Sequence, residues 1–360
     1  MALIPRSLKK GDTIAFVSPS FRLNDILPEP VERGKAYIES LGFHVKIFFN
    51  SLPPESTSIA ESIRVRVEEL LAAFKDPEVS AIITTIGGAH ANELLPFLDY
   101  DVIKSNPKIF LGYSDITFLH YAIQSQTGLR TFYGPSILSD FADLPSPISL
   151  TVDHFLHVLT GSGGGPVGPI PRSTQFADDL PDFLIAEPDS KKPRALNTSP
   201  TWRWLGKGRA SGRLYGGTIV CVTRLLAGPY APSWKDKIVF LESAMGDDVT
   251  IPYSVDEYRN NLVDLALAGV FNDINGLVIG RGYKYTAEMQ EELANVILEV
   301  FDVIVPKVRG GGSSSDHIPI LFNVDVGHTS PLVTLPFDAL ARLDSEADEF
   351  TILEPGVQDP

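Results

Sequence analysis

One serine of this sequence, Ser114, lies at a position that would suit a catalytic nucleophile. Ser114 lies in the stretch FLGYSDITFLH, residues 110–120, between an apolar run and a run with helical character. A serine at such a turn can attack a carbonyl carbon if a base takes its proton. It can equally cap the helix that follows, because serine is a preferred N-cap residue. The stretch is not a G-x-S-x-G elbow, since Ile116 occupies the last glycine position, so both interpretations stay open.

The general base for such a serine has to come from the seven histidines. Four of them begin a strand or sit in helix-like runs, where structural roles are expected: His44, His120, His154 and His157. His328, in DVGHTSPLVTLP, follows a glycine and precedes a polar turn, and loops at strand ends tend to carry functional side chains. His317, in GGGSSSDHIPI, is its rival, and the local sequence leaves the two nearly even.

The group that orients the base is expected to be an acid at a strand end. Glu242 directly follows the apolar residues IVFL, which would put its carboxylate at the carboxyl edge of a sheet. A solvated carboxylate is the plain alternative. An oxyanion hole needs backbone N–H groups aimed at the developing charge. The N–H of Asp115 is one natural donor, and that of Gly88 in TIGGAH is another, because glycine lets the backbone approach a ligand closely.

The other motifs of the sequence are weak. The runs GGGSSS and GSGGG lack the Lys-Ser/Thr of a phosphate loop, and neither is G-x-G-x-x-G. No cluster of Cys and His indicates zinc, and we expect neither a metal nor a cofactor. The single cysteine, Cys221, excludes an intrachain disulfide and is expected to pack as a small hydrophobe.

The composition is that of an acidic globular protein. The net charge of −15 and the sequence pI of about 4.9 disfavour nucleic acid and an anionic membrane surface as partners. The N-terminal stretch has no apolar h-region, and no run approaches the length of a membrane span. We therefore expect a cytoplasmic protein that binds a small substrate.

The elements that must position these residues alternate along the chain. In residues 1–160, strand-like and helix-like runs alternate, which predicts an α/β domain with a mostly parallel sheet flanked by helices, Rossmann- or flavodoxin-like, carrying the serine. Residues 161–205 are rich in Gly, Pro and Ser and are interpreted as a flexible linker. Residues 206–360 alternate again and predict a C-terminal α/β domain carrying the acid and the base. A cleft between two lobes is a common place for a small-molecule site.

Six stretches together resemble one enzyme family. They follow in the family's order over nearly the whole chain, and they are GDTIAFVSPS, TIGGAHANELLPFLDYDVIKSNPKIFLGYSDITFLHYAI, TGLRTFYGP, GRLYGGTI, IVFLES and NVDVGHTSPLVTLPF. GYSDIT with a preceding double glycine and a later GHTSP is a specific combination. The chain resembles the LD-carboxypeptidase family of serine peptidases and looks closest to its microcin C immunity branch.

The resemblance implies a Ser-Glu-His triad. Carried over position by position, the nucleophile is Ser114, the orienting acid Glu242 and the base His328, which decides between the two rival histidines. The family's oxyanion hole corresponds to the backbone of Gly88 and Asp115. The implied chemistry is hydrolysis of an amide bond through an acyl-enzyme, without metal or cofactor, by a homodimer.

The resemblance also implies a substrate class. Family members cut amide bonds near a free carboxylate, as in muropeptides, and the microcin branch cuts aminoacyl nucleotides. Where that branch tends to carry Asn-Ser, this chain has AHAN, so His90 is a candidate substrate contact or a helix cap. Trp202 and Trp204, in SPTWRWLGKG, are candidates for stacking on a nucleobase, or aromatics packed under the linker. Acyl transfer to an amine and a non-catalytic binding module are the alternative functions.

Overall fold

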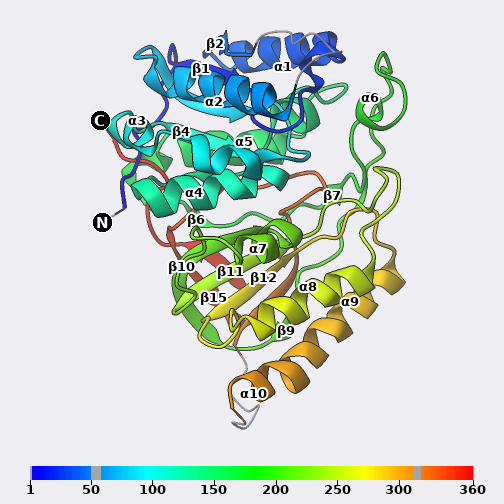
Figure 1. The fold of residues 1–360 in the computed structure, drawn as a ribbon. Coiled ribbons are helices and arrows are strands. Elements are labelled where there is room, and N and C mark those ends of the chain that lie inside the picture. Colours follow the sequence, from blue (N-terminus) through cyan, green and yellow to red (C-terminus); the bar gives the residue numbers. More distant parts are fainter. Residues whose placement is uncertain (1, 50–57, 311–317, 360) are drawn as a thin grey trace.

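The computed structural model describes residues 2–49, 58–310 and 318–359 as two sheets surrounded by helices (Figure 1). The first sheet comes mainly from the N-terminal half of the chain and the second mainly from the C-terminal half. The two chain ends run together, since the backbone N–H of Ser7 donates to the carbonyl of Gln358 over 2.9 Å. Within the described ranges, no helix combines the length and apolarity that a membrane crossing requires.

The first sheet has the strand order β14-β5-β4-β3-β1-β2, with β1 to β5 parallel and β14 antiparallel. Its strands are β1 (Thr13–Val17), β2 (His44–Ile47), β3 (Val79–Thr84), β4 (Ile109–Gly112), β5 (Phe132–Tyr133) and β14 (Leu335–Pro336). Its helices are α1 (Pro28–Ser40), α2 (Ile59–Lys75), α3 (Tyr100–Ser105), α4 (Thr117–Thr127) and α5 (Ser149–Leu159). Strands β3 and β4 are buried throughout, as in parallel sheets covered by helices on both faces. The predicted mostly parallel sheet is confirmed.

Helix α2 illustrates how local sequence sets these elements. The Ser58 hydroxyl accepts a hydrogen bond from the backbone N–H of Glu61 and so caps the first turn. Val67, Leu70 and Phe74 are buried, and their spacing of three and four residues puts them on one helix face. This face packs on β1 and β3, the strands that lead toward the predicted site.

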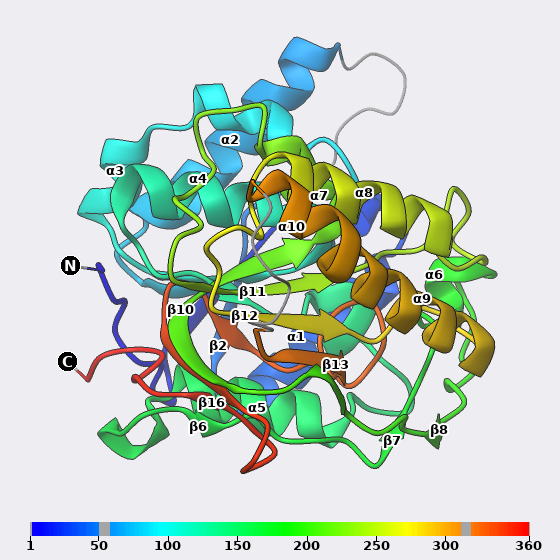
Figure 2. The ribbon, with the colours of Figure 1, turned by 90° about the horizontal axis from the view of Figure 1, so that it is seen from below.

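The second sheet has the strand order β6-β16-β15-β10-β11-β12-β13-β9. Its strands are β6 (Gly168–Pro169), β9 (Arg203–Gly206), β10 (Arg209–Thr218), β11 (Lys237–Glu242), β12 (Gly276–Gly280), β13 (Ile320–Val324), β15 (Leu340–Asp344) and β16 (Glu349–Ile352). Strands β10 to β13 are parallel, and the others pair antiparallel at the two edges. The helices of this half are α7 (Ile219–Leu225), α8 (Val255–Leu267), α9 (Ala287–Glu299) and α10 (Val305–Val308), with α8 and α9 side by side (Figure 2).

Residues 161–205 contain more regular structure than their composition indicated. Strand β6 joins the edge of the second sheet, and β7 (Gln175–Phe176) pairs with β8 (Asn197–Thr198) on either side of α6 (Asp182–Ile185). Strand β9 begins before the expected C-terminal domain and pairs with β13, while β14 from the C-terminal half pairs with β5. Backbone hydrogen bonds therefore cross both expected boundaries, because open sheet edges accept any strand that reaches them.

The carboxyl ends of three strands carry the predicted catalytic residues. Strand β4 ends at Gly112, just before Ser114, strand β11 ends at Glu242, and β13 ends at Val324, just before the loop of His328. Open α/β sheets bind ligands at this edge. A continuous apolar core includes residues of both sheets and holds their edges against each other.

Candidate active site

The turn after β4 presents the hydroxyl of Ser114. The residue has a left-handed backbone with φ of 64°, a conformation that is uncommon outside glycine and often marks a functional position. It begins a short 3-10 turn that leads into α4. Its Oγ lies 2.9 Å from Nε2 of His328. Helix α4 has Ile116 at its N-cap without a side-chain bond, so the serine hydroxyl faces the histidine and does not cap the helix.

Gly87 lets the loop after β3 approach this serine. A Cβ atom on Gly87 would lie 2.6 Å from Cβ of Ser114 and 2.9 Å from its Oγ. Any side chain here would displace the hydroxyl. The double glycine therefore serves the close approach of two loops, which goes beyond the plain strand-to-helix turn considered from the sequence.

His328 lies between Ser114 and Glu242. Its Nδ1 is 2.7 Å from Oε2 of Glu242, and both side chains are buried, with 4% and 0% exposed. Burial alone would raise the pKa of Glu242, but its interaction with the imidazole and its hydrogen bonds outweigh burial and lower it. The carboxylate therefore stays ionised and can hold Nδ1–H, which leaves Nε2 to accept the serine proton.

Two hydroxyl groups complete the site and were missed by the sequence analysis. The Tyr133 hydroxyl donates to Oε1 of Glu242 over 2.5 Å and accepts from the backbone N–H of Ser114 over 3.2 Å. The Thr218 hydroxyl donates to the same carboxylate oxygen. Burial raises the pKa of Tyr133 far above its usual value, so it remains a donor. Tyr133 ends β5 and Thr218 ends β10, and the strand-end rule that indicated Glu242 could have found both.

A buried ion pair holds the loop that carries His328. Nη1 of Arg281 lies 2.8 Å from Oδ1 of Asp325, and both side chains are almost fully buried. Arg281 also donates through Nε to the Thr329 hydroxyl over 3.1 Å and through Nη2 to the Pro331 carbonyl over 3.2 Å. The guanidinium thus binds residues on both sides of the histidine and limits where the imidazole can lie.

The carboxylate of Asp115 braces the loop that contains Gly88. Its Oδ2 accepts a hydrogen bond from the Ser20 hydroxyl over 2.6 Å and one from the backbone N–H of Ala91 over 2.8 Å. Burial raises its pKa, and these donors only partly oppose the shift. Gly88 lies in the loop after β3 whose double glycine approaches Ser114, and Asp115 directly follows Ser114. The predicted oxyanion donors, the backbone N–H groups of these two residues, therefore lie on the two loops that meet at the serine.

A cavity of about 400 Å³ opens beside Ser114 and His328, a volume typical of small-molecule sites. Loops after β1, β3, β4 and β11 and the segment around α6 form its walls. Its other lining residues are Phe21, Leu23, Ile86, Gly87, Gly88, Tyr113, Ser139, Leu180, Leu184, Ala244, Met245 and Val249. The reactive hydroxyl, the imidazole and a proposed oxyanion donor therefore share one small, largely apolar space.

The structure does not bring His90 to this cavity. Its side chain is 63% exposed, and its Nδ1 lies 3.2 Å from Glu93. It lines a separate hollow together with Ser20 and Arg66. It does not cap the following helix through its side chain either. Its backbone is left-handed, with φ of 76°, and its ring lies 6.5 Å from that of Phe21, which lines both hollows.

The two tryptophans are not among the described residues that line this cavity. The indole N–H of Trp202 donates to Asp325 over 3.0 Å, and that of Trp204 donates to Asp348 over 2.8 Å. Both rings pack partly buried against the core, and neither lines the cavity. The pairing of β9 with β13 explains their place, because it fixes this stretch on the edge of the second sheet. In this structure the packed alternative describes them.

Other chemically capable residues take structural roles or lie outside the description. His120 bonds through its ring to the Thr131 hydroxyl and the Gly112 carbonyl, each over 2.9 Å, and burial lowers its pKa to about 4. Cys221 is buried, which raises the pKa of its thiol well above the usual range. His317, the rival base, lies outside the described residues.

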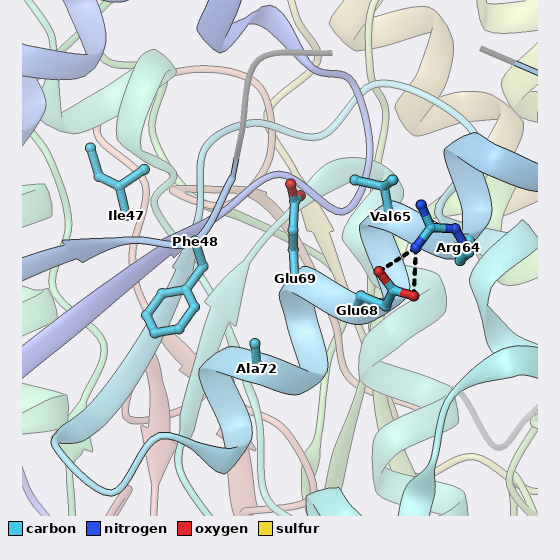
Figure 3. Close-up of a pocket in the computed structure, with 7 residues that line it drawn as sticks. All are labelled: Ile47, Phe48, Arg64, Val65, Glu68, Glu69 and Ala72. Carbon is cyan, nitrogen blue, oxygen red and sulfur yellow. Dashed lines mark hydrogen bonds and ion pairs between the residues drawn. The ribbon is translucent and has the colours of Figure 1, made fainter.

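A second cavity, of about 490 Å³, lies between the end of β2 and helix α2 (Figure 3). Its lining side chains are apolar or charged, and Arg64 is bridged to Glu68 on the same helix. The Glu69 carboxylate there is paired with Arg22. Among the lining residues that the structure describes there is neither a serine nor a histidine, so this cavity has no group suited to acyl transfer.

Two family models together match most of the chain. The model of the LD-carboxypeptidase N-terminal domain matches residues 14–134, and that of the C-terminal domain matches residues 211–343. The chain belongs to the LD-carboxypeptidase family. It is accordingly a peptidase that hydrolyses amide bonds. Ser114 lies in the first matched range, and Glu242 and His328 lie in the second.

Relatives within the LD-carboxypeptidase family match almost the whole chain. The microcin C7 self-immunity protein MccF of Escherichia coli is 28% identical over 98% of this chain and 96% of its own length. A MccF-like protein of Bacillus anthracis has a solved structure with 33% identity and a TM-score of 0.82, covering 98% of this chain and 100% of that one. MccF in complex with aspartyl sulfamoyl adenosine is 27% identical with a TM-score of 0.81, over 99% and 100% of the two chains.

Proposed function

We propose that Ser114, His328 and Glu242 form the catalytic triad with which this peptidase hydrolyses its amide bond. The observation that carries the proposal is one chain of contacts, from Ser114 Oγ to His328 Nε2 over 2.9 Å and from His328 Nδ1 to Glu242 over 2.7 Å. The three residues come from different strand ends and two sheets. A serine is a weak nucleophile until a base and an orienting acid are arranged in this order.

In the proposed mechanism the imidazole of His328 takes the proton of Ser114 as Oγ attacks the amide carbonyl. The backbone N–H groups of Gly88 and Asp115 stabilise the oxyanion that forms. The imidazolium, held by Glu242, then gives its proton to the leaving nitrogen, and the C–N bond breaks. Water attacks the acyl-serine with the same imidazole as base, and the acid leaves.

We further propose that the substrate is peptide-like or an aminoacyl nucleotide. Support comes from the MccF structures, which hold aspartyl sulfamoyl adenosine and glutamyl sulfamoyl guanosine. In these compounds the aminoacyl group is joined to the nucleoside through the nitrogen of a sulfamoyl group. The bond to be cut is therefore an acyl–nitrogen bond. The cavity of about 400 Å³ beside Ser114 suits an aminoacyl group of this size.

The test is the Ser114→Ala variant, assayed on a panel of L,D-peptides and aminoacyl sulfamoyl adenosines. We expect kcat/KM to fall by at least about 10³-fold, because the nucleophile is lost while binding remains. The melting temperature should stay close to that of the wild type. Ser125→Ala, which removes a hydroxyl bonded to the Ala122 carbonyl on α4, is the matched control and should keep full activity.

Full activity of Ser114→Ala would refute the triad. A fluorophosphonate probe gives an independent reading, because it labels only an activated serine. Absence of label on Ser114 in the folded wild type would favour a binding module without catalysis.

A further inference from the structure

We infer that the substrate group received by the cavity beside Ser114 is apolar and uncharged, unlike the acidic aminoacyl groups of the MccF ligands. The inference rests on the proposed function, since it names the substrate class of the same site. It is supported by the apolar side chains that line the cavity and by the charged groups that lie near it.

Most of the described residues that line the cavity are apolar. The apolar side chains come from the loop after β1, the segment around α6 and the loop after β11: Phe21, Leu23, Leu180, Leu184, Met245 and Val249. Only a few polar groups face the same space, and two of them are the proposed nucleophile and base. Burial of an alkyl or aromatic group against such walls is favourable in proportion to the apolar area removed from water.

The rim of the cavity leaves apolar surface in contact with solvent. Phe21 is 44% exposed and Val249 is 39% exposed, and both line the cavity. Large exposed hydrophobic side chains gathered at a concave site are typical of a ligand-binding surface. An apolar substrate group would cover both.

The described lining of the cavity offers no cation to an acidic substrate group. Among the described residues that line it there is neither a lysine nor an arginine. Ser139 lines the cavity, and its hydroxyl donates over 2.7 Å to the buried carboxylate of Asp140. Glu242 stands behind the imidazole of His328. A carboxylate placed here would therefore meet mostly apolar walls, with no lysine or arginine among the described lining residues, which disfavours its charged form.

The basic residue Arg194 near the His328 loop is already engaged. Its guanidinium is buried and lies 2.5 Å from Asp143. It also donates to the Asp179 carbonyl over 3.0 Å and to the Ser330 hydroxyl over 2.8 Å. A substrate carboxylate could recruit it only by breaking this buried pair, so Arg194 does not alter the preference.

Leucyl and aspartyl sulfamoyl adenosine provide a matched pair of probes. Their side chains have nearly the same shape, since two methyl groups in one replace two carboxylate oxygens in the other. We expect kcat/KM of the wild type to be at least about tenfold higher for the leucyl compound. Equal cleavage, or faster cleavage of the aspartyl compound, would overturn the inference.

Calorimetry of the two compounds binding to the Ser114→Ala variant measures the same preference without turnover. Tighter binding of the leucyl compound supports the inference, and equal or weaker binding overturns it. If the leucyl compound binds tighter but the wild type cleaves neither probe, the aminoacyl-nucleotide function fails while the apolar preference stands. If neither probe binds, both are overturned.

Met245→Lys tests the missing charge directly. A lysine at this wall should raise the aspartyl-to-leucyl ratio of kcat/KM by at least about tenfold, because it supplies the absent cation. Met245→Leu keeps the wall apolar and should leave the ratio unchanged. The same ratio in the lysine variant and the wild type would contradict the argument from charge.

Discussion

Glu242 is a carboxylate without contact to water that nevertheless keeps its charge. The hydroxyls of Tyr133 and Thr218 share its Oε1, and the imidazole of His328 lies at Oε2. Because its pKa is lowered on folding, its contribution to stability is complete above its unfolded pKa of about 4.3 and is lost as the pH falls through the folded value. Burial raises the pKa of Asp115, so the effect of this residue on the free energy of unfolding has the opposite pH dependence. Its protonation stabilises the folded protein as the pH falls.

Tyr133→Phe tests the hydroxyl that links Glu242 to the backbone of Ser114. We expect kcat/KM to fall by about 10- to 100-fold, because the carboxylate and the serine backbone lose one shared partner. Loss of a donor also raises the pKa of Glu242, so the acidic limb of the pH–rate profile should move to higher pH. Stopped assays from about pH 4 to 9 measure both effects.

Tyr121→Phe is the matched control for this prediction. Tyr121 is equally buried, and its hydroxyl has no hydrogen-bond partner in the described part of the chain. Removing it should leave the pH–rate profile in place. A Tyr133 variant whose profile coincides with that of the control would exclude the proposed link.

The segment around α6 is the element that closes one side of the cavity. Leu180 and Leu184 line the cavity from this segment, and Phe183 lies under the guanidinium of Arg33 at 4.9 Å. In Figure 1, α6 lies beside the half of the molecule that contains the first sheet. In the sequence, α6 comes after the strands β1 to β5 of that sheet. Ala177 and Ser330 also exchange two backbone hydrogen bonds just before α6, so both side chains and backbone hold this segment.

Arg194→Ala should weaken this attachment. The variant leaves the buried carboxylate of Asp143 without its partner, and loss of one member of a buried pair costs about 3–5 kcal/mol in the free energy of unfolding. Urea denaturation measures the change. Arg194→Met combined with Asp143→Leu removes both charges and should recover much of the stability.

The exposed pair of Lys191 and Glu29 is the control for this element. Both side chains are more than half exposed, so Lys191→Ala should leave the free energy of unfolding close to that of the wild type. If Arg194→Ala costs as little as this control, the buried pair does not hold the segment.

At the scale of the whole molecule, the site exists only where the two sheets meet. Ser114 comes from the first sheet, and Glu242 and His328 come from the second. Strand β14 pairs with β5 and so ties the C-terminal half to the first sheet beside Tyr133. The two halves are therefore mutually dependent, because each supplies strand pairing and core to the other.

The homodimer and the cytoplasmic location stay predictions from the family resemblance and the sequence. Light scattering of the purified chain should give twice its mass of 39.3 kDa over a dilution series. Activity per chain should stay constant over the same series, since all proposed catalytic groups lie in one chain. A mass of one chain at every concentration would contradict the dimer.

The sequence by itself determined the α/β alternation, the mostly parallel first sheet and the turn that presents Ser114. These depend on local periodicity and on the glycines beside the turn, both of which can be seen in a few consecutive residues. The strand end indicated Glu242, but family resemblance, rather than spacing, selected His328 over His317, because the contacts of His328 with Ser114 and Glu242 span 214 and 86 residues of chain. Only the tertiary structure decided the roles of Tyr133 and Thr218, and it leaves His90, Trp202 and Trp204 out of the described lining of the cavity. Such contacts depend on which strand edges pair and which loops meet, and these are properties of the packed molecule as a whole.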